Sequence, residues 1–127
     1  CATSPYYNRI KFYTGDCNRV VDEIVTRIQS IDRELSVKNR TSINLSFLDP
    51  TGLELEWKTI EKLAGIKRMD LIIYYPQMGL ERVMPNELFN QSNTIVDTFF
   101  GTRNWREIYL SYKKRETLRL HRSLMDF

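Results

Sequence analysis

Two aspartates stand where parallel strands are expected to end. Asp49 follows the alternating run 43–48 and precedes Pro50, which disfavours the helical conformation for the aspartate and holds it extended. Asp16 follows a second alternating run, 9–14. Ligands of open α/β sheets bind at the carboxyl ends of the strands. A carboxylate in that place could accept a hydrogen bond from an amine or take up a proton, so Asp49 is the first candidate for a catalytic residue.

Each aspartate also has a structural interpretation that involves no ligand. Asp-Pro and Pro-x-Gly sequences are common in turns, and aspartate often caps its own turn, so Asp49 could simply secure the bend at Pro50–Gly52. Asp16 could cap a helix that begins at about Asn18, a role that is compatible with accepting a hydrogen bond from an amine. Tyr75-Pro76-Gln77 follows a third predicted strand and could form a wall of the same crevice.

Other common catalytic arrangements are missing from the sequence. It contains no phosphate-binding loop, no Gly-x-Gly-x-x-Gly fingerprint, no nucleophile elbow and no His-Glu-x-x-His zinc motif. The single histidine, His121, lies among arginines and leucines near the end of the chain and is best explained as a surface residue. Cys1 and Cys17 form neither a disulfide framework nor a ligand set, so no metal site is predicted.

The elements that must position these aspartates alternate between strand and helix. Periodicity predicts strands at about 9–14, 43–48 and 69–75, with helices between them that begin near Asn18 and Trp57. The run 69–75 is apolar apart from Asp70, which suits a strand covered on both faces. Strands that alternate with helices indicate βαβ crossovers. The predicted fold class is therefore α/β, a parallel sheet with flanking helices, with Asp16 and Asp49 at one edge.

The last third of the chain is predicted to be mainly helical. Residues 78–85 are interrupted by glycine and proline and predict a loop, and a short helix over 95–100 is expected to start from Ser92 or Asn93. A long helix follows Asn104. The stretch 103–122 holds seven basic and two acidic residues. This face could meet phosphates, but a solvated basic surface is the preferred interpretation, with Tyr109 and Tyr112 assigned to core packing.

Length and composition predict one domain, 1–127, that belongs to a larger protein. The chain has 127 residues, 42% of them apolar, and a net charge of +3. No run is long enough to span a membrane, and residues 1–7 contain neither the basic nor the apolar region of a signal peptide, so the expected location is the cytoplasm. A chain that opens on Cys1 and ends at Phe127, with only about three core strands, predicts a fragment whose missing sheet neighbours lie in the same polypeptide or in an oligomer.

The order strand-Gly-Asp-helix followed by strand-Asp-Pro resembles the middle of Rossmann-like S-adenosylmethionine-dependent methyltransferases. The resemblance implies that Asp16, with the backbone of Cys17, contacts the adenine amine of the cofactor. It implies that Asp49 and Pro50 lie beside the methyl donor and position the acceptor. The glycine-rich half of that cofactor site is absent from this sequence. Thr51-Gly52 stand where amino-methyltransferases usually carry proline and an aromatic residue, so this loop supplies no stacking platform for a base.

Within that superfamily, the chain is similar to the three-Cys-motif partner proteins, a prokaryotic and uncharacterised family. Four segments carry the resemblance: Phe47-Leu48-Asp49-Pro50-Thr51-Gly52-Leu53-Glu54, Trp57-Lys58-Thr59-Ile60-Glu61-Lys62-Leu63-Ala64, Met78-Gly79-Leu80-Glu81-Arg82 and Phe99-Phe100-Gly101-Thr102-Arg103-Asn104-Trp105. The resemblance implies a methyltransferase-like protein with an unknown acceptor and a protein partner that carries a three-cysteine motif, and the fragment alone is expected to be inactive. The alternative is a non-catalytic interaction or nucleic-acid-binding module on the same scaffold.

Overall fold

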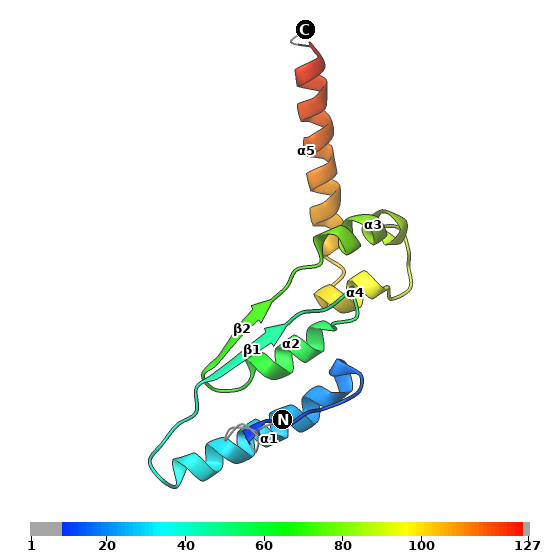
Figure 1. Cartoon of the computed structure of the whole chain (residues 1–127). Coiled ribbons are helices and arrows are strands. Elements are labelled where there is room, and N and C mark those ends of the chain that lie inside the picture. The colour runs from blue at the N-terminus through cyan, green and yellow to red at the C-terminus, as the bar shows by residue number, and fades with distance from the viewer. Residues whose placement is uncertain (1–8, 126–127) are drawn as a thin grey trace, which may run out of the picture. The chain divides into compact units, whose positions relative to one another are not determined.

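The described residues fold into five helices and two strands. A computed structural model describes the backbone of residues 9–125 and the side chains of residues 9–117. In chain order the elements of Figure 1 are α1 (Cys17–Ser36), β1 (Asn44–Leu48), α2 (Trp57–Ala64), β2 (Met69–Ile73), α3 (Gln77–Glu87), α4 (Ile95–Phe100) and α5 (Trp105–Met125). The predicted mixture of strand and helix is confirmed, and so is the predominantly helical C-terminal part.

The two strands form a parallel pair, as the sequence predicts. Hydrogen bonds at the two ends of the ladder fix the register: the Asn44 amide donates to the Arg68 carbonyl at 2.9 Å, and the Tyr74 amide donates to the Leu48 carbonyl at 2.8 Å. In a parallel pair, both strands end at the same edge. The loop after Leu48 and the segment after Ile73 therefore leave the sheet together.

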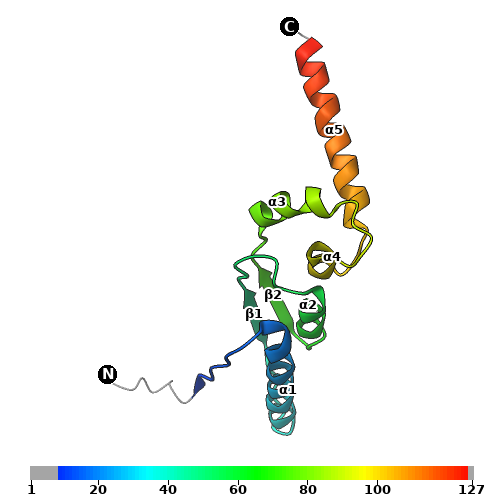
Figure 2. The ribbon, with the colours of Figure 1, turned by 90° about the vertical axis from the view of Figure 1, so that its right-hand side faces the viewer.

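Helix α1 begins where the sequence places a helix start. Asp16 is its N-cap, with a carboxylate oxygen that accepts from the Asn18 amide at 2.9 Å. Gly15 precedes the cap with φ +136°, a conformation open to glycine and strained for other residues. Helix α2 lies alongside the strands in Figure 2, and the Thr59 hydroxyl of α2 donates to Asn18 Oδ1 at 2.7 Å. This contact holds α2 to the first turn of α1.

The apolar side chains of β1 lie on the more exposed face of the sheet. Alternation along β1 is observed, but Asn44 and Ser46 are half-buried, whereas Leu45 and Phe47 are 67% and 65% exposed. Ile72 of β2 is also exposed, so the largely apolar run 69–75 is not covered on both faces by the described residues. Alternation fixes which side chains share a face, but it does not determine which face receives the helices.

One predicted strand is absent from the described residues, and a predicted loop is a helix. Residues 10–14 form no strand, and the sheet has two strands where three were expected. An alternating segment becomes a strand only when a neighbour completes its hydrogen bonds, and none of the described residues does so for this one. Helix α3 occupies the predicted loop 78–85: its Leu80 is buried, and Pro85 falls in the last turn, so it interrupts the helix only near its end.

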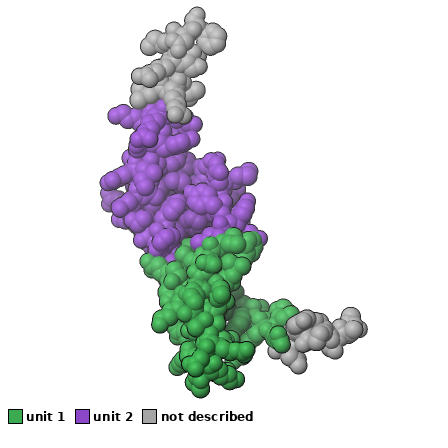
Figure 3. All heavy atoms as spheres, turned by 90° about the vertical axis from the view of Figure 1, so that its left-hand side faces the viewer, with its two compact units in different colours: residues 1–47, 59–72 green, residues 48–58, 73–127 purple. Residues whose placement is uncertain are grey.

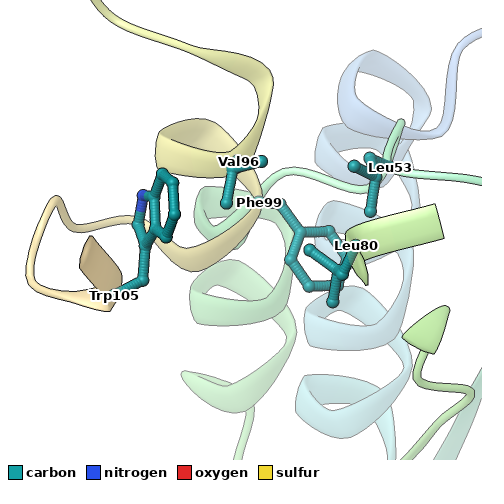
Figure 4. Close-up of a cluster of buried hydrophobic side chains, with 5 residues drawn as sticks. All are labelled: Leu53, Leu80, Val96, Phe99 and Trp105. Atoms are coloured by element: carbon teal, nitrogen blue, oxygen red, sulfur yellow. The ribbon is translucent and has the colours of Figure 1, made fainter. Parts of the chain in front are cut away.

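A cluster of buried side chains joins the later elements. It consists of Leu53, Leu80, Val96, Phe99 and Trp105 (Figure 4). Helix α4, which supplies Val96 and Phe99, begins at Thr94 with a reciprocal capping box and ends at Gly101 in the left-handed conformation. The short helix expected over 95–100 is confirmed, although it begins from Thr94 instead of Ser92 or Asn93.

The chain divides into two compact units, which Figure 3 colours separately. One comprises residues 1–47 and 59–72, and the other comprises residues 48–58 and 73–127. The first contains α1 and most of both strands, and the second contains the cluster around Val96. Among the described residues, no helix combines the length and the apolar composition that a membrane crossing requires.

Candidate functional site

The loop after β1 leaves the carboxylate of Asp49 exposed. The turn is closed by another residue: Glu54 Oε1 accepts from the Thr51 amide at 2.6 Å and from the Thr51 hydroxyl at 3.0 Å. Hydrogen bonds from the backbone of Glu54 and from Thr51 and Gly52 hold the pKa of the Glu54 carboxyl below its usual value, despite partial burial that acts the other way. Asp49 has no hydrogen-bond or ion-pair partner among residues 9–117. Its carboxylate is therefore available to a ligand.

An open groove of about 1060 Å³ lies at the carboxyl ends of the strands. Thr51 and Gly52 line it from the loop after β1, and Tyr74, Tyr75 and Pro76 line it from the segment between β2 and α3. The first turns of α3 contribute Gln77, Met78, Gly79, Glu81 and Arg82. The sequence predicts Tyr75-Pro76-Gln77 as a wall of a crevice beside the Asp-Pro loop, and these residues line this groove together with that loop.

The Tyr75 side chain lines the groove and contacts the buried cluster. Its ring packs against Phe99 of the buried cluster, with ring centroids 6.4 Å apart at a tilt of 60°. Burial, together with the nearby Glu81 carboxylate, raises the pKa of the Tyr75 hydroxyl. The hydroxyl therefore stays protonated at neutral pH and can donate a hydrogen bond into the groove.

The predicted cofactor-binding residues lie in the other unit. Asp16 caps α1 through one carboxylate oxygen, and the other lies 3.8 Å from Arg19 Nε. Cys17, the first residue of α1, is exposed. Because the strand expected before Asp16 is absent, this carboxylate follows an irregular segment instead of a strand end. The structure therefore leaves Asp16 with Cys17 in one unit and Asp49 with Pro50 in the other.

Sequence reasoning missed the most strongly bonded carboxylate of the second unit. Asp97, 3% exposed, accepts from the Trp105 indole at 2.7 Å, from the Thr94 amide at 3.0 Å and from both Nη atoms of Arg106. Burial raises the pKa of Asp97, but the bonds from Arg106, Trp105 and Thr94 outweigh it and hold the pKa well below its usual range. Protein donors occupy both oxygens of this buried carboxylate, which is the arrangement of a structural centre. The spacing Thr94-x-x-Asp97 was the signal that could have revealed it.

The basic helix α5 is more exposed than the sequence predicts. Tyr109 packs against the buried cluster, as expected, but Tyr112 is 58% exposed, and the assignment of Tyr112 to the core is wrong. Lys113 is paired with Glu116 at 2.8 Å, and Lys114 and Arg115 are exposed. The side chains of Arg119, His121 and Arg122 lie outside the described residues.

No group of histidine, cysteine or acidic side chains in the described part of the chain is arranged to hold a metal ion. In comparisons with known proteins, no family model, no curated protein and no solved structure matches the chain. The functional argument therefore rests on the geometry of the two strand-end segments and the groove between them.

Proposed function

We propose that the chain is a methyltransferase-like protein that transfers a methyl group from S-adenosylmethionine to an acceptor still to be identified, in the cytoplasm and on a Rossmann-like scaffold. One observation supports this most strongly. Asp49 ends a parallel strand with its carboxylate free, while Glu54 secures the turn that Asp49 could otherwise have secured. An acidic side chain that makes no structural hydrogen bond at such an edge is placed to contact a ligand.

The roles follow from the chemistry of each residue. S-adenosylmethionine, when bound, supplies an activated methyl group. Asp49 orients the acceptor through a charge-assisted hydrogen bond or accepts the proton that the acceptor loses. Pro50 restricts the backbone around Asp49 and so keeps the carboxylate in place. Asp16, with the backbone of Cys17, receives the adenine amine.

The residues present fit the adenine end of the cofactor. Asp16 uses Oδ1 for the Asn18 amide, which leaves Oδ2 exposed to solvent beside Arg19, and an amine can donate to that oxygen. Capping and amine binding are thus compatible at one carboxylate. The glycine-rich loop that surrounds the rest of such a cofactor has no counterpart in the sequence.

The uncovered face of the sheet supports the proposal that further elements complete this scaffold. Ile43, Leu45, Phe47 and Ile72 share that face and are all exposed. Exposed apolar patches of this kind mark surfaces that something else covers. We assign that role to sheet neighbours in the same polypeptide or in an oligomer, and the expected protein partner carries a three-cysteine motif.

Replacing Asp49 with asparagine tests the catalytic role. Asparagine keeps the shape of the side chain and suits the turn, but it removes the charge. A charge-assisted hydrogen bond contributes ~1.5–3 kcal/mol, so turnover in the complete protein should fall by roughly ten- to a hundredfold. The measurement is a methylation assay with the natural acceptor, and binding of S-adenosylmethionine should be unchanged.

Asp70→Asn is the matched control, because Asp70 is an exposed aspartate on β2 with no hydrogen-bond partner among the side chains described. It removes the same charge and should leave turnover unchanged. Titration of S-adenosylmethionine into the complete wild-type protein comes first, and absence of binding there rejects the enzyme. If cofactor binds and Asp49→Asn turns over like the wild type, Asp49 is not catalytic.

The exposure of Tyr112 favours a second candidate, a nucleic-acid-binding module that docks through α5. Tyr112 and Lys113 lie together, with the ammonium 5.9 Å from the ring centroid. If α5 contacts phosphates, affinity for nucleic acid should fall steeply as salt rises, because each contact releases counterions. Replacing Lys113, Lys114 and Arg115 with glutamine should flatten that dependence, and absence of binding at low salt would reject this candidate.

A further inference from the structure

We propose that the groove at the carboxyl ends of β1 and β2 binds a nucleotide, with the base against Tyr74 and Tyr75 and the phosphate at Arg82. The proposal goes beyond methyl transfer, because it names a ligand class and holds whether or not the chain is an enzyme. The loop after β1 carries Thr51-Gly52 and offers no aromatic ring. The neighbouring strand supplies two tyrosines to the same groove.

The two rings are suited to stacking because both are exposed, the Tyr74 ring on an anchored backbone and the Tyr75 ring in contact with Phe99. Tyr74 and Tyr75 are 59% and 54% exposed, so neither is consumed by the core. The amide of Tyr74 is bonded to the Leu48 carbonyl at 2.8 Å, and the ring of Tyr75 is braced by Phe99. Rigid aromatic side chains lose little freedom when a flat ring binds them, and every base has a face that can stack.

The polar residues of the groove match the remaining parts of a nucleotide. The Glu81 carboxylate accepts from Gln77 Nε2 at 2.7 Å through Oε1, which leaves Oε2 for an exocyclic amine of the base. The protonated hydroxyl of Tyr75 can donate to a ring nitrogen or carbonyl. Arg82 has no hydrogen-bond or ion-pair partner in the described part of the chain, and its guanidinium is suited to a phosphate.

These contacts predict a preference among bases. Cytosine and adenine carry an exocyclic amine that can donate to Glu81, whereas thymine carries a carbonyl that a carboxylate repels. The groove should therefore bind a single-stranded deoxycytidine tetranucleotide more tightly than a thymidine tetranucleotide. The same groove should bind cytidine 5′-monophosphate if one nucleotide suffices, and only the tetranucleotide if a strand is required. Either result supports the proposal.

The test is fluorescence anisotropy of the labelled deoxycytidine tetranucleotide, titrated with the full chain. Tyr74→Ala should weaken binding by roughly five- to a hundredfold, the range expected for loss of one stacked base. Phe12→Ala is the matched control, since Phe12 is an exposed aromatic residue (75%) that does not line the groove, and this variant should bind like the wild type. Arg82→Gln should weaken binding and reduce its salt dependence, whereas Arg40→Gln, in an exposed loop, should do neither.

Three results would overturn the proposal. The first is no saturable binding at low salt. The second is binding that survives Tyr74→Ala but is lost when Lys113, Lys114 and Arg115 are replaced, which would assign it to α5. The third is displacement of the nucleotide by S-adenosylhomocysteine in wild type but not in Tyr74→Ala, which would give the groove to the cofactor. If the chain binds the nucleotide but not S-adenosylmethionine, only the methyl-transfer proposal is rejected. If it binds S-adenosylmethionine but not the nucleotide, only this inference is rejected.

Discussion

Replacing Asp97 with alanine is expected to lower the free energy of unfolding by ~3–5 kcal/mol, because it leaves a largely buried charge without its partner. Arg106 donates to both oxygens of Asp97 and also to the Leu88 carbonyl at 3.1 Å. The same change strips the Trp105 indole of its acceptor. One carboxylate thus joins α4, α5 and the end of α3. Urea unfolding followed by circular dichroism provides the measurement.

The control is Asp22→Ala, which breaks an exposed ion pair with Lys62 at 2.6 Å. Exposed pairs contribute little, so the loss should be no more than about 1 kcal/mol. The double variant Asp97→Ala, Arg106→Met should recover part of the stability, because it removes the stranded charge along with its partner. Equal losses in Asp97→Ala and Asp22→Ala would contradict the central role assigned to Asp97.

The same carboxylate predicts how stability depends on pH. Its pKa in the folded chain is lowered below the value of about 3.9 that an aspartate has when unfolded. The unfolded chain therefore takes up a proton first as pH falls, and the contribution of Asp97 is fully present above about pH 4 and lost below it. Asp97→Asn should lack this part of the acid dependence. An unchanged slope below pH 4 would contradict the pairing.

The second large effect is expected at Gly101. This residue ends α4 with φ +66°, where a side chain costs about 1–2 kcal/mol. A methyl group there would also lie 2.8 Å from Cβ of Trp57 and closer still to its ring. Overpacking typically costs a further 1–3 kcal/mol, so Gly101→Ala should destabilise the chain by ~2–5 kcal/mol in total. Thermal and urea unfolding of the variant provide the measurement.

Gly65→Ala is a control that should have the opposite sign. A methyl group at Gly65, just after α2, would meet only the Glu61 and Lys62 carbonyls at 3.5 Å, which is ordinary contact. The φ angle at Gly65 is not positive, so alanine is tolerated and should stabilise the chain by about 0.4–1 kcal/mol through the unfolded state. If both variants behave alike, the clash with Trp57 is not the cause.

Elements whose signals are local could be predicted from the sequence. Periodicity predicted a helix that begins near Asn18, which is α1, and Asp16 was correctly predicted as its possible cap. Gly101 marked the end of α4. Helix α3 was missed because Gly79 and Pro85 were treated as breaks, although burial of Leu80 stabilises the helix and the proline lies in its last turn. In α3, the packing of Leu80 outweighed the low helix propensity of Gly79 and Pro85.

What depends on distant partners could not be predicted. The run 9–14 alternates like a strand, but a strand needs a neighbour, and alternation does not supply one. The candidate site likewise has parts that the sequence predicts and parts that depend on distant partners. Asp49 and the wall Tyr75-Pro76-Gln77 follow from strand ends, whereas the closure of the turn by Glu54 depends on a side chain that sequence periodicity ignores. Asp97 was missed because its partners lie as far as nine residues away.

The exposed apolar face of β1 and β2 has a consequence for the heat capacity of the chain. Folding lowers heat capacity in proportion to the apolar surface that it removes from water. Leu45, Phe47 and Ile72 are already hydrated when folded, so they contribute little to the increment on unfolding. The chain should fall short of the usual ~12–15 cal/mol/K per residue. Its curve of stability against temperature is accordingly flatter, and whatever covers this face will steepen it.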